Sequence, residues 1–153
     1  MTKPISRRDL SLLLPALAAA TARAQAPAPA ARPPAPAPAA LDTKVYHDKQ
    51  IAYKGDEKHK GREFFNGVTH TGYHIQMHET IIGPGLQTHA PHKHENEEIV
   101  IVLEGTLEMT NEGKSEVAET GSVIYFGSNQ LHNARNVGTT PCRYYVVELR
   151  ASA

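Results

Sequence analysis

Hydrophobic and polar residues alternate along short segments in the C-terminal two thirds of the chain. From residue 73 to 81 the odd positions are mainly apolar, whereas the even positions are polar and include His74 and His78. On a strand this alternation separates an apolar row from a polar row, and the polar row faces either solvent or a cavity. Residues 99–103 form a continuous apolar run that ends before Gly105, which predicts a strand buried on both faces.

Turn-forming residues separate these segments at intervals of about ten residues. Residues 111–114, Asn-Glu-Gly-Lys, have the composition of a tight hairpin, and residues 123–126 and 144–147 supply two further strands. The chain shows no sustained helical period. The pattern therefore predicts an all-β fold, a single closed barrel whose interior holds side chains or one small ligand.

The first 26 residues differ in character from the rest of the chain. They begin with a charged segment, continue with a short apolar run over residues 10–20, and end in alternating small residues, as in a cleaved export signal. The apolar run is too short to span a membrane. Ser6, Arg7 and Arg8 resemble the start of a twin-arginine signal, and the general secretory route is the alternative. The sequence thus predicts an exported, periplasmic bacterial protein.

A spacer separates this signal from the folded domain. Residues 27–40 hold six of the 11 prolines of the chain and otherwise mostly alanine, a composition that favours an extended, semi-rigid linker. We therefore expect the barrel domain to span residues 41–153, with its most informative part at about 72–149.

Composition narrows the chemistry of the domain. The 153 residues include 16 basic and 16 acidic residues, 6% aromatic residues and no Trp, so nucleic-acid binding is not expected. Membrane insertion is not expected either, because no transmembrane segment, lipid-attachment cysteine or basic stripe is found near the start of the mature chain. Cys142 is the only cysteine, which excludes an intrachain disulfide and a cysteine-rich zinc site. We expect Cys142 to be a small apolar core residue. Histidines and carboxylates remain as metal ligands.

One cluster has the spacing of such ligands. His92 and His94 are two residues apart, so on an extended segment both imidazoles project from the same face, and Glu98 shares their parity. A further donor has to come from elsewhere in the chain, and His132 is the only histidine in its C-terminal third. Imidazoles with one carboxylate suit a divalent transition metal and leave positions open for water or substrate, as in a catalytic site.

Two segments resemble the motifs of the cupin family. His92, His94, Glu98 and Gly105 follow the first motif of that family, although Gly85 precedes His92 by one residue too many. The second motif resembles residues 121–136, which include Gly121, His132 and Asn136. In that segment Gly127 and Asn129 stand where the motif has proline and glycine.

This resemblance implies a double-stranded β-helix, the cupin or jelly-roll barrel, with one metal ion in its mouth. Carried over to this chain, it implies that His92, His94, Glu98 and His132 bind the ion. It also implies a homodimer, since cupins commonly pair through their sheets. Glu95 and Glu97 are alternative carboxylates if the strand register slips.

Several further residues are candidates for proton transfer. Glu98 itself is one, and His74, His78 and Tyr145 are others if they point inward. His89 is interpreted as a loop residue or as a group that supports a ligand. His47, His59 and His70 lie in polar segments and are assigned no role.

These features predict an exported metalloenzyme that acts on a small organic substrate. Mn or Fe is the expected ion, with Zn, Ni, Cu or Co as alternatives. A dioxygenase-like oxidoreductase is the leading hypothesis, and decarboxylase, lyase or isomerase chemistry is also consistent with the resemblance. The alternative is a non-catalytic periplasmic protein that binds a small ligand, and a third hypothesis is metal storage.

Overall fold

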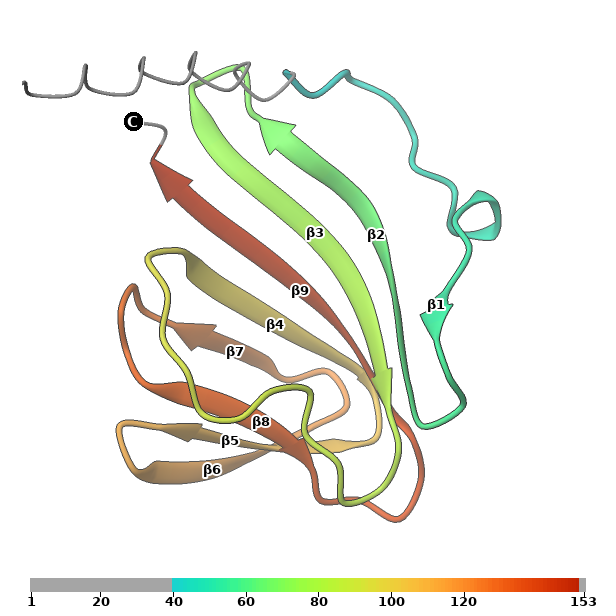
Figure 1. Cartoon of the computed structure of the whole chain (residues 1–153), viewed down its shortest axis with the longest axis vertical. Helices are drawn as coiled ribbons and strands as arrows, with labels where there is room; N and C mark the ends of the chain where they lie inside the picture. The colour runs from blue at the N-terminus through green and yellow to red at the C-terminus, as the bar shows by residue number, and fades with distance from the viewer. Residues whose placement is uncertain (1–39, 152–153) are drawn as a thin grey trace, which may run out of the picture. The chain divides into compact units, whose positions relative to one another are not determined.

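The computed structural model describes residues 40–151, which form β-strands joined by loops and one short 3-10 turn (Figure 1). The predicted export signal and the linker, apart from Ala40, lie outside the described residues. The elements are η1 (Asp48–Gln50), β1 (Lys54–Gly55), β2 (His59–Val68), β3 (Tyr73–Ile82), β4 (Glu97–Glu104), β5 (Thr106–Asn111), β6 (Lys114–Glu119), β7 (Val123–Phe126), β8 (His132–Asn136) and β9 (Cys142–Ala151). Within residues 40–151, no helix is long and apolar enough to cross a membrane.

The strands form two antiparallel sheets. The large sheet has the order β1-β2-β3-β9-β4-β7, and the small sheet has the order β6-β5-β8. Every pairing between these strands is antiparallel. The all-β barrel predicted from the sequence is confirmed.

The core lies between the inner faces of the sheets. Its buried members come from both sheets and are Ile82, Val100, Val102, Leu107, Ala118, Ile124, Phe126, Cys142, Tyr144 and Val146. Cys142 is fully buried, as expected of a small apolar residue, and burial raises the pKa of its thiol to about 11. This thiol is therefore a packing residue.

Strand β4 corrects one prediction. The apolar run at residues 99–103 was expected to be buried on both faces, but only its even positions are fully enclosed. Val100 and Val102 are each 1% exposed, whereas Ile99 is 36% exposed. The prediction was wrong because no other described element covers the outer face of the large sheet at β4, where Ile99 lies beside Tyr125.

Two tight turns follow directly from the sequence. The predicted hairpin joins β5 to β6, and its two central residues, Glu112 and Gly113, both have positive φ values, of 47° and 78°. This is the turn whose twist suits antiparallel strands. Gly105 joins β4 to β5 with φ 87°, and a Cβ there would lie 2.9 Å from the Cα of Cys142, so only glycine fits.

The outer face of the large sheet holds a buried acid. Glu79 of β3 is completely buried and accepts hydrogen bonds from Arg62 Nε at 2.5 Å and from Arg143 Nη1 at 3.2 Å. The segment before β2 closes over this group, because Arg62 also donates to the carbonyl of Asp48 and lies under the ring of Tyr53. The sequence pattern had placed Glu79 in a mainly apolar row, and these paired charges explain why it is buried there.

Candidate metal centre

Two chain segments meet at the mouth of the barrel to bring the histidines together. The loop before β4 pairs with the first residue of β8 through two backbone hydrogen bonds, from His92 N to His132 O at 3.0 Å and from His132 N to His92 O at 2.9 Å. The ring centroids of His92 and His132 lie 4.9 Å apart, and those of His94 and His132 lie 5.0 Å apart. Backbone pairing therefore sets the positions of the rings.

The turn before β8, which belongs to the second motif, is hydrogen-bonded to the loop that carries His92 and His94. Asn129, which replaces the glycine of the motif, has φ 58°, a left-handed conformation that asparagine tolerates better than most residues. Its backbone N–H donates to the carbonyl of His94 at 2.7 Å. The substitution thus keeps the turn and ties it to a histidine of the site.

Each of the three imidazoles is oriented by a carbonyl two residues away. Nδ1 of His92 lies 3.1 Å from the carbonyl of Ala90, Nδ1 of His94 lies 2.9 Å from that of Asn96, and Nδ1 of His132 lies 2.8 Å from that of Gln130. A carbonyl only accepts, so each Nδ1 has to carry the proton. Each Nε2 is left with a free lone pair, which is the state that a metal ligand needs.

These lone pairs converge with one carboxylate. Ligand atoms of His92, His94 and His132 lie within 4.8 Å of one another. Glu98 Oε2 lies 3.3 Å from His94 Nε2 and 3.7 Å from His132 Nε2. Two ligands that are each about 2.1 Å from one ion are separated by about 3.0–3.4 Å at octahedral or tetrahedral angles, so the observed spacing approaches that of a shared ion.

A buried, unpartnered nitrogen tests whether an ion fits here. His132 is 3% exposed, it stacks on Phe126 with ring centroids 4.3 Å apart, and its Nε2 is buried without a hydrogen-bond partner among the described residues. Leaving such an atom unsatisfied costs free energy, and a metal ion would satisfy it. The donor set of three imidazoles and a carboxylate fits a divalent transition metal.

The carboxylate of Glu98 lies in an environment that disfavours its charge. Burial raises its pKa, the nearby carboxylate of Glu148 raises it further, and His94 opposes both effects. Without an ion, the site therefore holds a buried acid whose nearest polar partners are imidazoles.

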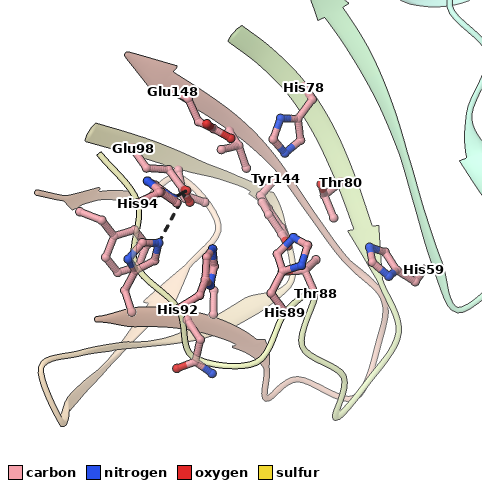
Figure 2. A pocket seen from close by; sticks show the side chains of 16 residues that line it. His59, His78, Thr80, Thr88, His89, His92, His94, Glu98, Tyr144 and Glu148 are labelled. Atoms are coloured by element: carbon pink, nitrogen blue, oxygen red, sulfur yellow. Dashed lines mark ion pairs between the residues drawn. The ribbon is translucent and has the colours of Figure 1, made fainter. Parts of the chain in front are cut away.

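A cavity of about 270 Å³ opens beside this cluster (Figure 2). Figure 2 shows Glu148 and His78 on one side of it and His59 and His89 further toward the loops. Burial is the main cause that lowers the pKa of His78 and of His89, so both rings favour the neutral form. The other lining residues are Thr80, Thr88, His92, His94, Glu98, Val100, Phe126, His132, Asn133, Ala134, Tyr144 and Val146.

Comparison with known proteins identifies the architecture. A family model described as a Cupin domain matches residues 78–148, which supports the cupin family. No curated protein sequence matches the chain. Solved structures resemble the described barrel, and one of them is an RmlC-like cupin from Shewanella frigidimarina, with TM-score 0.57 and 16% identity over 69% of this chain and 88% of that one. The described domain has the cupin fold.

Two further structures share this fold and carry different names. A polyketide cyclase, RemF from Streptomyces resistomycificus, has TM-score 0.54 and 20% identity over 72% of this chain and 85% of its own. A predicted oxalate decarboxylase from Thermotoga maritima has TM-score 0.56 and 19% identity over 69% of this chain and 98% of its own. At such identities the likeness concerns the fold alone.

The structure brings some predicted site residues to the cavity of the cupin barrel and leaves others away from it. His92, His94, Glu98 and His132 meet at its mouth, and His78 lines its wall. His74 shares the face of His78 but lies four residues closer to the start of β3 and does not line the cavity. Glu95 and Glu97 do not line it either, so the register places Glu98 inward.

Tyr145 corrects a second prediction. It packs edge-on against Phe64 on the outer face of the sheet, with ring centroids 5.6 Å apart. Its neighbour Tyr144 lines the cavity instead, because successive residues of β9 point to opposite faces. The apolar run at residues 144–147 offered no polar row from which the inward face could be read.

Besides Tyr144, two ionisable residues of the cavity were not foreseen. His59, at the start of β2, had been assigned no role, yet it lines the cavity. Glu148 had not been considered at all. A charged residue directly after the apolar run at residues 144–147, still within β9, is the signal that would have found it, since an acid in such a position needs a reason to be there.

Proposed function

We propose that this protein is a mononuclear metalloenzyme whose ion is held by His92, His94, His132 and Glu98. The observation that carries the proposal is the orientation of the three imidazoles, each with Nδ1 at a carbonyl and Nε2 free. Metal-binding histidines commonly have this arrangement, and here it is shared by three histidines from two separate segments of the chain. Mn or Fe is the ion we propose, with Zn, Ni, Cu and Co as alternatives to be tested by metal analysis.

The substrate is a small organic molecule that enters the cavity beside the four ligands. When bound, the ion supplies Lewis acidity and coordination positions for substrate or dioxygen. Val100, Val146 and Phe126 give part of the cavity wall an apolar surface, which favours the apolar part of a bound substrate. A dioxygenase-like oxidation is the reaction class that we propose, and decarboxylation, elimination and isomerisation are the other classes that such a site serves.

His78 is the residue to which we assign proton transfer. It lies on the cavity wall, its Nδ1 is buried without a partner among the described residues, and burial keeps the ring neutral. A neutral imidazole is able to accept a proton from a bound substrate and to return it. Glu98 is the second such group if it leaves the ion during turnover.

Metal analysis of the full-length protein tests the proposal. The protein is purified without chelator or metal-affinity resin, and a His92→Ala/His94→Ala variant serves as the control. One equivalent of a first-row metal in the wild type alone supports the site, and oxygen consumption with small hydroxy and keto acids then tests turnover. No bound metal, and none taken up on addition, would overturn the proposal. Bound metal without turnover of any small acid would favour the ligand-binding alternative.

The proposal includes export and pairing. The sequence of residues 1–26 supports export to the periplasm, which cell fractionation tests. The outer face of the large sheet supports a homodimer, because Ile99, Val123 and Tyr125 are exposed there at 36%, 65% and 56%. Light scattering on the wild type and on a Tyr125→Lys variant tests it, since a lysine in the interface would shift the population to monomer.

A further inference from the structure

The cavity holds a second carboxylate that the metal site does not use. Glu148 of β9 is the direct antiparallel partner of Glu98 on β4. Residues opposite each other on adjacent strands have Cβ atoms about 4.5–5.5 Å apart and point to the same face. Figure 2 shows both side chains on the same side of the sheet, where they line the cavity together.

The position of Glu148 is fixed by the loop that carries the histidines. The side-chain amide of Asn96 donates to Glu148 Oε2, and the carbonyl of Asn96 accepts the proton of His94 Nδ1. One residue therefore links this carboxylate to a metal ligand. The other oxygen, Oε1, makes no hydrogen bond within the described part of the chain, so it is free to accept one from a bound molecule.

Basic side chains are missing from the cavity. None of the Lys and Arg residues in the range 40–151 lines it. Arg62 of β2 and Arg143 of β9, the two strands that flank β3 in the same sheet, are bound to Glu79 on the opposite face. The polar groups that remain are imidazoles, hydroxyls, one amide and the two carboxylates. The fixed charges of the cavity wall are thus those of Glu98 and Glu148.

This charge balance restricts the ligand. A divalent ion offsets the two carboxylates and leaves the cavity without a net positive charge. A dianion would then add two negative charges to a partly enclosed space in which no basic residue can pair with them. A ligand hydroxyl, by contrast, would find a charged acceptor in Glu148 Oε1, and hydrogen bonds to a charged acceptor are stronger than neutral ones.

We infer that Glu148 makes the cavity selective for small hydroxylated molecules that carry at most one negative charge, and that it accepts a hydrogen bond from the ligand hydroxyl. This inference rests on the proposed metal site and names the substrate class for it. It assigns Glu148 to specificity and leaves metal binding to the four ligands at the mouth.

Two probes of similar size test this selectivity. Glycolate has one carboxylate and one hydroxymethyl group, whereas oxalate has a second carboxylate in place of the hydroxymethyl group. Their affinities are measured by calorimetry on full-length protein loaded with Zn²⁺, which does not react with oxygen. The variant is Glu148→Gln, which keeps an oxygen for Asn96 and removes the charge. The control is Glu97→Gln, which removes the same charge from the opposite face of β4.

Glu148→Gln should strengthen oxalate binding by about tenfold or more, because a unit charge at a few ångströms is removed from a weakly screened site. The affinity for glycolate should change by less than about threefold, because the relief of repulsion on its single carboxylate is offset by the loss of the charged acceptor for its hydroxyl. In Glu97→Gln both affinities should stay within about twofold. Circular dichroism checks that each variant is folded.

The Zn²⁺ content of each sample separates two kinds of failure. If the wild type holds no Zn²⁺, the metal site itself is wrong and the inference falls with it. If all three proteins hold Zn²⁺ and Glu148→Gln changes oxalate and glycolate binding by the same factor, or no more than Glu97→Gln does, the metal site stands and the role of Glu148 is overturned.

Discussion

Glu79 and Glu98 are two enclosed acids on opposite faces of the same sheet, and they differ in their partners. Glu79 is completely buried, and each of its oxygens receives a guanidinium donor, from Arg62 or from Arg143. The side chain of Glu98 is 14% exposed, and it lies near imidazoles and a second carboxylate. None of the described Lys or Arg residues forms an ion pair with it.

This difference separates a structural acid from a functional one. A buried charge is tolerated only when another charge compensates it. For Glu79 the chain supplies that charge itself, so the acid links β2, β3 and β9. For Glu98 the described chain supplies neither Lys nor Arg but only imidazoles, so the compensating charge has to come from a bound proton or a metal ion. The same residue type thus serves the fold on one face and the site on the other.

The largest effect that we expect is on stability, from Glu79→Gln. Removal of this charge would leave two guanidinium groups on a covered face without their acid, at a cost of about 3 kcal/mol in the free energy of unfolding. Glu104→Gln is the matched control, because Glu104 pairs with Arg143 at an exposed position and should cost less than about 1 kcal/mol. Urea denaturation of both variants measures the difference, and equal losses would show that Glu79 is not a structural acid.

The next effect is on metal binding, from His132→Ala. Loss of one ligand should weaken metal binding by more than about 100-fold, since even changes in groups that only support a ligand cost about 10–100-fold. His74→Ala is the control, because it removes an imidazole from the barrel but not from the cavity. Competition with a chromophoric chelator gives both affinities, compared at a temperature at which both variants are folded. Similar losses in the two variants would contradict the assignment of the site.

Most residues of the candidate metal site could be predicted from the sequence. The remaining cavity residues could not, because their prediction requires knowing which row of each strand faces inward. The parity of His92, His94 and Glu98, together with the motif around His132, identified residues that the structure brings together. Periodicity gives two rows but does not say which one is inside, and a shift of one residue exchanges them. On β9 both rows are apolar around Tyr144 and Tyr145, which is why the wrong tyrosine was chosen.

Contacts between residues far apart in the chain could not be predicted from the sequence either, because they depend on the order of the strands in the sheet. The ion pairs of Glu79 join residues 17 and 64 positions apart. Glu148 meets Glu98 only because β9 lies between β3 and β4 in the sheet. Local patterns carry no record of such neighbours, whereas the hairpin at residues 111–114 is local and was predicted correctly.

The smallest effect that we expect is the most direct test of the comparison, because its sign is opposite to that of Glu79→Gln. In metal-free protein, burial and Glu148 raise the pKa of Glu98, so the folded state holds this proton more tightly than the unfolded state does. The contribution of Glu98 to the free energy of unfolding is therefore most favourable at low pH. It is lost as the pH rises through the pKa that Glu98 has in the folded state. At pH 7 Glu98→Gln should stabilise the metal-free protein by about 1 kcal/mol or less, and the gain should shrink toward pH 4.

With one equivalent of Zn²⁺ the wild type should become the more stable protein, since a bound ion stabilises the folded state by mass action and the variant binds it less tightly. Urea denaturation at both pH values, with chelator and with Zn²⁺, measures all four differences. A loss of stability in the metal-free variant at pH 7 would mean that His94 and His132 already compensate the charge, and Glu98 would then resemble Glu79 after all.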